Sequence, residues 1–223
     1  SSQRTELKRG WNWTSFHTFI YGYNGLLALE LSLGEYGLHI KNQNSFVTNY
    51  SGSWYGSLNS VNVEQMYMIR VSEDFTLVLN GLVVDPQHYP ITLSKNWEWI
   101  GYPVNVEMPL AEALSGITPS NNDIIKTQGE FATYTEGIGW SGTLEKMKPG
   151  KGYMYFNNSN SNKYLVYPKP SSKESRADNT LNEELHWTAD HTMYPNNMNM
   201  IAVLNVDGSE LKEKYEIAAF DGS

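Results

Sequence analysis

Hydrophobic and polar residues alternate near the start of this chain in a pattern that predicts a β-strand. Trp11 and Trp13 are separated by Asn12, and a period of two places both indole rings on the same face of a strand. Further short segments rich in strand-forming residues, each bounded by turn residues, lie at 39–43, 45–50, 54–58, 66–71 and 76–79. This spacing is typical of a compact antiparallel sandwich or barrel.

Two segments have the spacing of short helices. Apolar residues recur at helical intervals in residues 26–33, and the similar segment 109–116 begins with proline, which is favoured at the first position of a helix. Near the end of the chain, an alternating segment from residue 198, an Asp207-Gly208 turn and a return strand at 215–220 predict a β-hairpin.

The chain contains an internal duplication. Residues 7–16 match residues 93–102, with Trp11 against Trp97 and Trp13 against Trp99, an offset of 97 − 11 = 86. Further matches at an offset of 85 or 86 join 40–43 with 125–128, Phe46 with Phe131, 54–58 with 140–144, and 67–68 with 153–154. Chance does not account for so many aligned positions, so the two segments are expected to have the same fold.

The duplication divides the chain into unit one, residues 1–90, and unit two, residues 91–168. The polar segment 169–179 is predicted to be a linker, and 180–223 a C-terminal β segment that begins a further module. The predicted fold is therefore mainly β, with two homologous antiparallel units that are sandwich-like or barrel-like. Each unit carries one short helix, and a β-hairpin follows them.

Apolar residues that recur in both copies are expected to form the core, because each lies in otherwise polar surroundings. Large rings that recur in each copy of a small β unit fill a core more often than they bind a ligand. The residues expected to be mostly buried are Trp11, Trp97, Ile40, Ile125, Phe46, Phe131, Leu58, Leu144, Tyr67 and Tyr153.

Composition excludes several classes of partner. The chain has 16 Lys and Arg against 24 Asp and Glu, a formal net charge of −8, and no basic run. Nucleic acids and anionic membranes are therefore not expected as partners, because both require a cationic surface. Cysteine is absent, which excludes disulfides and thiolate chemistry, and no apolar stretch reaches the roughly 20 residues that membrane insertion needs. No signal peptide begins at Ser1, and the sequence is interpreted as part of a longer protein.

No group of residues typical of an enzyme is found. Nucleophile elbows, phosphate loops, dinucleotide fingerprints and Ca²⁺ loops are missing from the sequence. His186 and His191 are five residues apart and do not share a helix face, so no metal site and no cofactor is predicted. A glycosidase needs two carboxylates, but the sequence does not single out one pair among its 24 acids. We therefore predict a non-catalytic protein.

Aromatic residues are the remaining signal, with 7 Trp and 15 Tyr in the chain. Flat sugar faces stack on such rings, while amides and carboxylates bind the hydroxyl groups. Rings that occur in only one copy of the duplication are better candidates for a binding surface than rings that recur. The candidate ligand-binding residues are Tyr21, Tyr23, Asn24, Tyr36 and Tyr55.

The segments 10–16, 125–134, 139–144 and 148–155 resemble a repeat of secreted and cell-surface proteins of Bacteroidetes-type bacteria. That repeat opens on Gly-Trp-Asn-Trp, continues with an Ile-Lys-x-Gln segment and closes on Pro-Gly-Lys-Gly-Tyr-Met. Unit one departs from it, because residues 63–66 replace the Pro-Gly-Lys-Gly turn.

The resemblance implies an accessory module of a secreted or cell-surface, multimodular protein, with no catalytic residues to carry over. The expected partners are a polysaccharide or host glycan and the other modules of the same polypeptide. A glycan-binding or adhesive module is the first hypothesis. A structural spacer without ligand is the alternative, and a glycan-active enzyme fragment is the second alternative.

Overall fold

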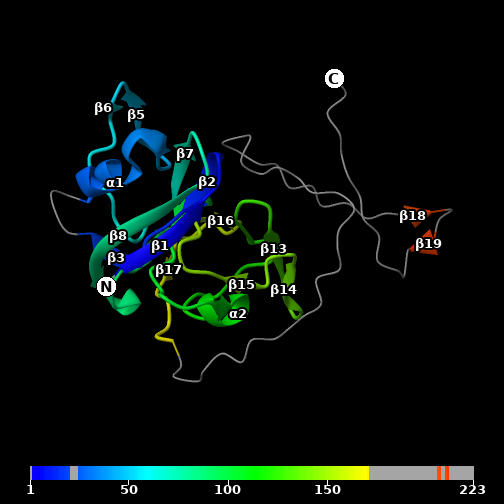
Figure 1. Cartoon of the computed structure of the whole chain (residues 1–223). Coiled ribbons are helices and arrows are strands. Elements are labelled where there is room, and N and C mark those ends of the chain that lie inside the picture. Colours follow the sequence, from blue (N-terminus) through cyan, green and yellow to red (C-terminus); the bar gives the residue numbers. More distant parts are fainter. Residues whose placement is uncertain (1, 21–24, 171–204, 207–208, 211–223) are drawn as a thin grey trace.

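The computed structural model describes residues 2–20, 25–170, 205–206 and 209–210 (Figure 1). These residues form a series of antiparallel sheets with two short α-helices. The predicted mainly β fold class is confirmed. Every described sheet is open, so the architecture is sandwich-like and not a closed barrel. None of the described helices has the length and apolar character needed to cross a membrane.

Two five-stranded antiparallel sheets dominate the structure. Sheet one has the order β2 (Gly10–Thr14), β7 (Tyr67–Val71), β4 (Gly37–Lys41), β5 (Phe46–Tyr50) and β6 (Ser53–Gly56). Sheet two has the order β10 (Asn96–Ile100), β16 (Tyr153–Asn157), β12 (Ile124–Lys126), β13 (Phe131–Thr135) and β14 (Gly139–Gly142). The two orders are identical when the strands are matched through the sequence duplication.

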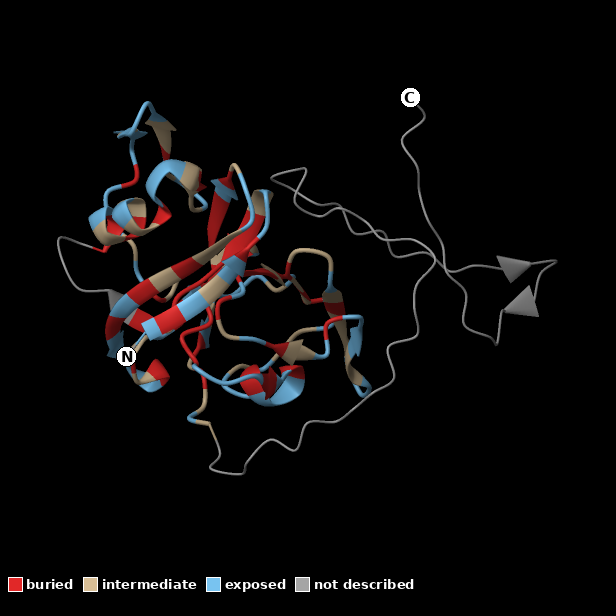
Figure 2. Cartoon of the chain, viewed as in Figure 1, coloured by how far each residue is buried: buried red, intermediate tan, exposed pale blue. Residues whose placement is uncertain are grey.

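Smaller sheets complete each unit. The long strand β8 (Phe75–Val83) pairs with β1 (Ser2–Leu7) and β3 (Thr18–Ile20), and β9 (Ile91–Leu93) pairs with β17 (Lys163–Leu165). A third pair joins β11 (Met108–Pro109) to β15 (Lys146–Met147). Buried and exposed residues alternate along β1 (Figure 2), since one of its faces covers the core of unit one.

Helix α1 (Leu26–Leu33) has the predicted bounds. Its buried residues Leu26, Leu29 and Leu33 lie on one face and join the core of unit one. A 3-10 helix, η1 (Gly34–Tyr36), follows α1, and a second, η2 (Pro86–His88), precedes β9. In unit two the predicted helix at 109–116 is too long, because Met108 and Pro109 pair with β15 and leave only α2 (Leu110–Ala113).

The C-terminal hairpin is described in part. Strands β18 (Asn205–Val206) and β19 (Ser209–Glu210) pair antiparallel on the two sides of the predicted Asp207-Gly208 turn. The return strand expected at 215–220, the linker beyond residue 170, and both His186 and His191 lie outside the described residues.

The prediction of the core is right for six of its ten residues, which are Ile40, Ile125, Leu58, Leu144, Tyr67 and Tyr153. It is wrong for Phe46, which is exposed, while Phe131, Trp11 and Trp97 are half-buried. The reason is strand alternation. Val47 of β5 faces the core, so its neighbour Phe46 faces outward, and both tryptophans lie on that same outer side of their sheets.

A tyrosine recurs at the matched positions 67 and 153 because its hydroxyl binds the preceding turn. The Tyr67 hydroxyl accepts a hydrogen bond from the backbone of Asn62 at 2.9 Å, and the Tyr153 hydroxyl accepts one from Lys148 at 2.7 Å. Burial raises the pKa of Tyr67 to about 12, so this hydroxyl stays protonated in neutral solution. Each tyrosine thus holds the turn before its strand, although the two turns have different sequences.

A glycine recurs at the matched positions 56 and 142 because of the backbone conformation there. Their φ angles are +154° and +147°, in a region that side chains rarely adopt. A Cβ at these positions would lie 2.0 Å from the carbonyl oxygen of Phe46 and 2.3 Å from that of Phe131. Only glycine allows the last two strands of each sheet to approach this closely.

The two units meet through the edge strands β2 and β10. The side chain of Gln128 accepts a hydrogen bond from the backbone of Trp13 at 3.0 Å and donates one to Trp11 at 2.8 Å. Gln43 makes the equivalent bonds to the backbone of Trp99, at 2.8 Å, and of Trp97, at 3.1 Å. Each glutamine side chain therefore replaces a missing neighbouring strand for the other unit.

Other contacts between the units repeat in the same reciprocal way. The backbone of Gly101 donates to Glu64 at 2.8 Å, and that of Ser15 donates to Gly150 at 3.3 Å. Residues 64 and 150 are matched by the duplication, so the two turns of different sequence have the same role. The contact is isologous, with the same surface used by both partners.

A layer of tryptophan and methionine fills the centre of this contact. Its buried members are Trp13, Met66, Met68 and Met154, with Trp11, Trp97 and Trp99 packed around them. The ammonium group of Lys41 lies 5.2 Å from the ring of Trp11 and 5.6 Å from that of Trp99. Lys126 has the matching positions, 4.6 Å from Trp97 and 5.8 Å from Trp13. The recurring Trp-x-Trp pair therefore joins the units and does not fill either core.

Candidate functional site

The outer face of sheet one carries a line of directly opposed side chains. Trp11 lies opposite Arg70, Arg70 opposite His39, His39 opposite Thr48, and Thr48 opposite Tyr55. The line crosses all five strands of the sheet. Because opposed residues of neighbouring strands share a face, these five side chains form one surface.

Phe46 and Tyr50 belong to the same surface, because they alternate with Thr48 along β5. We call Phe46 and Tyr50 together with the five residues of the line the aromatic face. Its rings are in contact. His39 stacks on Phe46 at 5.5 Å between centroids with 8° between the planes, and Tyr50 lies 6.2 Å from Tyr55 at 50°. The face runs outward from Trp11, whose ring meets His39 edge-on at 5.4 Å.

The outer end of the aromatic face is open to solvent. The exposed fractions are 48% for Phe46, 63% for Tyr50 and 61% for Tyr55. These are large values for aromatic residues, which usually bury most of their surface. An exposed group of rings on a rigid sheet is the usual mark of an interaction site.

Cationic groups lie among the rings. Arg70 is exposed and forms no ion pair with any described carboxylate. Burial lowers the pKa of His39, and the charges of Lys41 and Arg70 lower it further, so His39 is neutral at pH 7. Its Nδ1 is 2.8 Å from the hydroxyl of Thr48, which fixes the orientation of the imidazole ring.

Sheet two has a different surface at the matching positions. The opposed residues there, in strand order, are Trp97, Phe156, Ile124, Thr133 and Ser141. Tryptophan and threonine are retained, whereas Arg70, His39 and Tyr55 are replaced by Phe156, Ile124 and Ser141. Thr135 stands where unit one has Tyr50. On this matched surface, exposed tyrosines and an arginine are therefore present in sheet one and absent from sheet two.

The described candidate residues of the sequence analysis do not lie together in the structure. Tyr55 lies in the aromatic face. Tyr36 belongs to η1 and is half-buried against Phe75, 5.2 Å between centroids, away from that face. Tyr21, Tyr23 and Asn24 lie outside the described residues.

Tyr50, His39 and Arg70 were missed. Tyr50 could have been found from the sequence, because its match in unit two is Thr135 and it is therefore a ring present in one copy only. His39 and Arg70 could not, because their place beside Tyr55 depends on the order of the strands.

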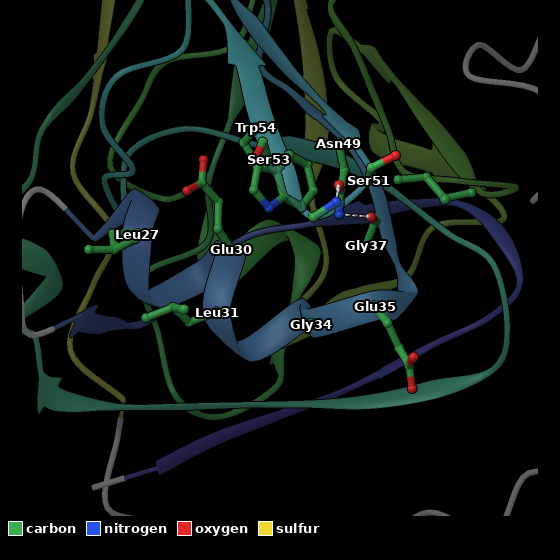
Figure 3. A pocket seen from close by; sticks show the side chains of 12 residues that line it. Leu27, Glu30, Leu31, Gly34, Glu35, Gly37, Asn49, Ser51, Ser53 and Trp54 are labelled. Carbon is green, nitrogen blue, oxygen red and sulfur yellow. Dashed lines mark hydrogen bonds between the residues drawn. The ribbon is translucent and has the colours of Figure 1, made fainter.

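A groove of about 770 Å³ lies on the other side of the β5–β6 hairpin (Figure 3). Leu27, Glu30 and Leu31 of α1 form one wall, and Asn49 and Trp54 form the other. Both ends of the Asn49 amide are occupied, since it donates to Gly37 at 2.9 Å and accepts from Gly52 at 2.8 Å. Burial raises the pKa of Glu30. The groove thus combines apolar walls with the side chains of Glu30, Glu35, Ser51 and Ser53.

A smaller groove of about 290 Å³ lies between the units and is lined by amides. These amides are used in the structure. Asn42 donates to Gln65 at 2.9 Å, and Gln43 bonds to the backbone of β10. Gln43 therefore joins the two units here, whereas the bond between Asn42 and Gln65 lies within unit one.

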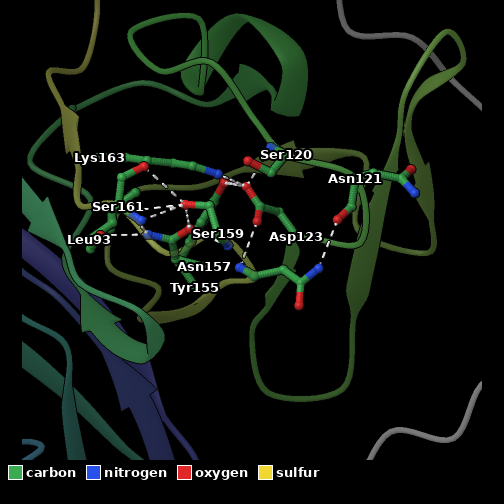
Figure 4. Close-up of polar contacts among 10 residues, drawn as sticks. Leu93, Ser120, Asn121, Asp123, Tyr155, Asn157, Ser159, Ser161 and Lys163 are labelled. Carbon is green, nitrogen blue, oxygen red and sulfur yellow. Dashed lines mark hydrogen bonds and ion pairs between the residues drawn. The ribbon is translucent and has the colours of Figure 1, made fainter.

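Unit two contains a buried polar network around Asp123 (Figure 4). The carboxylate accepts hydrogen bonds from the backbone of Ser120 and Asn158, both at 2.8 Å, and from the Tyr155 hydroxyl at 2.6 Å. It also forms an ion pair with Lys163. These contacts join the start of β12 to β16 and β17, so the network is structural. The described residues contain no group of three His, Cys, Asp or Glu placed to hold a metal ion.

Comparisons of the chain with protein-family models, with curated proteins and with solved structures give no match.

Proposed function

We propose that the chain is a non-catalytic module that binds a glycan on the aromatic face of unit one. The observation that carries this proposal is the difference between two matched surfaces. Where sheet two has Ser141 and Thr135, sheet one has the exposed rings of Tyr55 and Tyr50. A duplicated scaffold keeps the residues that it needs for folding, and an exposed aromatic pair in one copy requires another reason.

The chemistry of the face suits a sugar. Rings at 6.2 Å from one another offer two adjacent stacking surfaces for the apolar sides of successive sugar residues. Thr48 and Arg70 lie in the same line and present hydroxyl and guanidinium groups to sugar hydroxyls. The planes of Tyr50 and Tyr55 are inclined by 50°, so they suit a glycan chain that twists between neighbouring residues.

A structural spacer without ligand is the second candidate. The reciprocal contact between β2 and β10 favours it, because a fixed contact of this kind holds two units in one orientation. The spacer hypothesis gives no role to the exposed rings of unit one, and for that reason we place it second. Secretion and attachment at a cell surface remain part of the proposal, on the resemblance of the Gly-Trp-Asn-Trp and Pro-Gly-Lys-Gly-Tyr-Met segments.

The test is affinity electrophoresis and a glycan array with the full chain. The panel contains neutral and acidic polysaccharides of plant, host and microbial origin. We expect retention by at least one glycan, and at least about tenfold weaker binding for the double variant Tyr50→Ala with Tyr55→Ala, which corresponds to a loss of about 1.4 kcal/mol or more. Both side chains are exposed, so this variant should fold normally.

The matched control is Thr135→Ala with Ser141→Ala in unit two, which should bind as the parent chain does. Equal loss of binding in the control would place the site elsewhere. Absence of retention by every glycan of the panel would contradict the proposal and leave the spacer hypothesis.

A further inference from the structure

The five strands of sheet one contain no acidic residue. Their sequences hold Lys41, Arg70 and His39, so the formal charge of the sheet is +2 with a neutral histidine. The whole chain has a formal charge of −8. A cationic sheet in an acidic protein concentrates positive potential on one surface.

Sheet two shows that this charge is no property of the scaffold. The charged residues of its strands are Glu98 and Lys126, whose formal charges sum to zero. Lys126 matches Lys41, and both lysines lie over tryptophan rings in the contact between the units. Arg70 has no such counterpart, because Phe156 occupies its place.

Arg70 is therefore the charge that distinguishes the aromatic face. It is exposed, it lies between Trp11 and His39 in the line across the sheet, and no described carboxylate neutralises it. A guanidinium group binds a planar carboxylate through two parallel hydrogen bonds, which a neutral sugar does not offer.

We propose that the glycan bound on the aromatic face carries carboxylate groups, and that Arg70 binds one of them while Tyr50 and Tyr55 stack on sugars further along the same glycan. This inference rests on the proposed function and adds the class of ligand. A polymer with regularly spaced carboxylates, such as a uronate chain, or a glycan ending in an acidic sugar, meets both requirements.

The experiment compares each acidic glycan with a neutral partner of the same backbone, using the full chain. The pairs are polygalacturonate with its methyl ester, a sialylated glycoprotein with its desialylated form, and dextran sulfate with dextran. We expect a carboxylated member to bind at least about tenfold more tightly than its neutral partner and to lose this preference as ionic strength rises.

Two variants separate the parts of the inference. Arg70→Gln should abolish the preference for the carboxylated member and retain the weaker binding of its neutral partner, whereas Tyr55→Ala should weaken both. The control is Arg4→Gln, which removes the same charge from an exposed position on β1.

The outcomes are distinguishable. Equal binding of acidic and neutral partners, a preference for the sulfated polymer alone, or an unchanged preference in Arg70→Gln would overturn this inference while the proposed function stands. Absence of binding to every member of every pair would also overturn this inference, and only absence of retention by the whole glycan panel would overturn the proposed function with it.

Discussion

Gln43 and Gln128 make the same pair of hydrogen bonds, each to the edge strand of the other unit. They are matched by the duplication, as are the tryptophans whose backbone they bind. A primary amide has the donor and acceptor of a peptide group, so one side chain satisfies both exposed backbone groups of a strand edge. The recurrence of Gln with Trp-x-Trp in both copies is therefore explained by this contact.

Gln128→Ala should lower the free energy of unfolding by about 2 kcal/mol, because it leaves the backbone groups of Trp11 and Trp13 without their partners. Urea denaturation followed by tryptophan fluorescence measures the change. Gln87→Ala on the exposed η2 helix is the control. If Gln128→Ala were as stable as this control, the two bonds would contribute nothing to the contact.

Asp123→Asn should destabilise unit two by about 3–5 kcal/mol, since it leaves the buried ammonium group of Lys163 without its carboxylate. Adding Lys163→Met should recover part of the loss, because the unpaired charge is then removed. Thermal unfolding of both variants gives the comparison. A double variant less stable than Asp123→Asn alone would show that Lys163 has another partner that matters more.

Acidification should destabilise the protein as the pH falls below about 6.5, the ordinary pKa of histidine. Burial lowers the pKa of His17, and its Nδ1 has no hydrogen-bond partner in the described structure. The unfolded chain therefore takes up a proton at a higher pH than the folded chain does, and stability is lost as the pH drops through this range. His39, whose pKa is also lowered, acts in the same direction.

His17→Gln should make the free energy of unfolding less dependent on pH between about 6.5 and 5. Urea titrations at several pH values provide the measurement, with His88→Gln, an exposed position, as the control for the loss of an imidazole. A pH dependence identical to that of the parent chain would exclude His17 as a contributor.

Trp13→Ala should mainly lower stability, whereas Tyr55→Ala should mainly weaken binding. Trp13 is 2% exposed at the centre of the contact between the units, and its truncation should cost about 3–5 kcal/mol. Tyr55 is exposed, so its truncation should change stability by less than about 0.5 kcal/mol while it weakens glycan binding. A large loss of stability in Tyr55→Ala would indicate a structural role for that ring.

Most of the regular structure could be predicted from the alternation and spacing of the sequence. Helix α1 has the predicted bounds, and β5 and β7 differ from prediction by one residue. Strand β1 was missed, because its alternation of Gln3, Thr5 and Leu7 contains one strong apolar residue only.

Recurrence identified residues that matter, but it did not show what they do. Ile40 recurs because it fills a core, Gly56 because two strands approach closely, and Trp11 because two units meet. All three reasons produce the same pattern in a sequence. Only the order of the strands separates them, and the sequence contains no local signal for that order. For the same reason the sequence does not predict that Arg70 lies next to His39, since the two residues are 31 positions apart (70 − 39).

The glutamine contacts also bear on the number of copies that an array of this unit would contain. The five-stranded sheet of each unit has two edge strands, and the contact uses one of them, β2 or β10, together with one glutamine of the other unit. A third copy could not make this same reciprocal contact with an already joined pair, so its own equivalent of β2 and its glutamine would stay without this partner. Units of this kind are therefore expected to occur in pairs, and an array with an even number of copies leaves none of them without this contact.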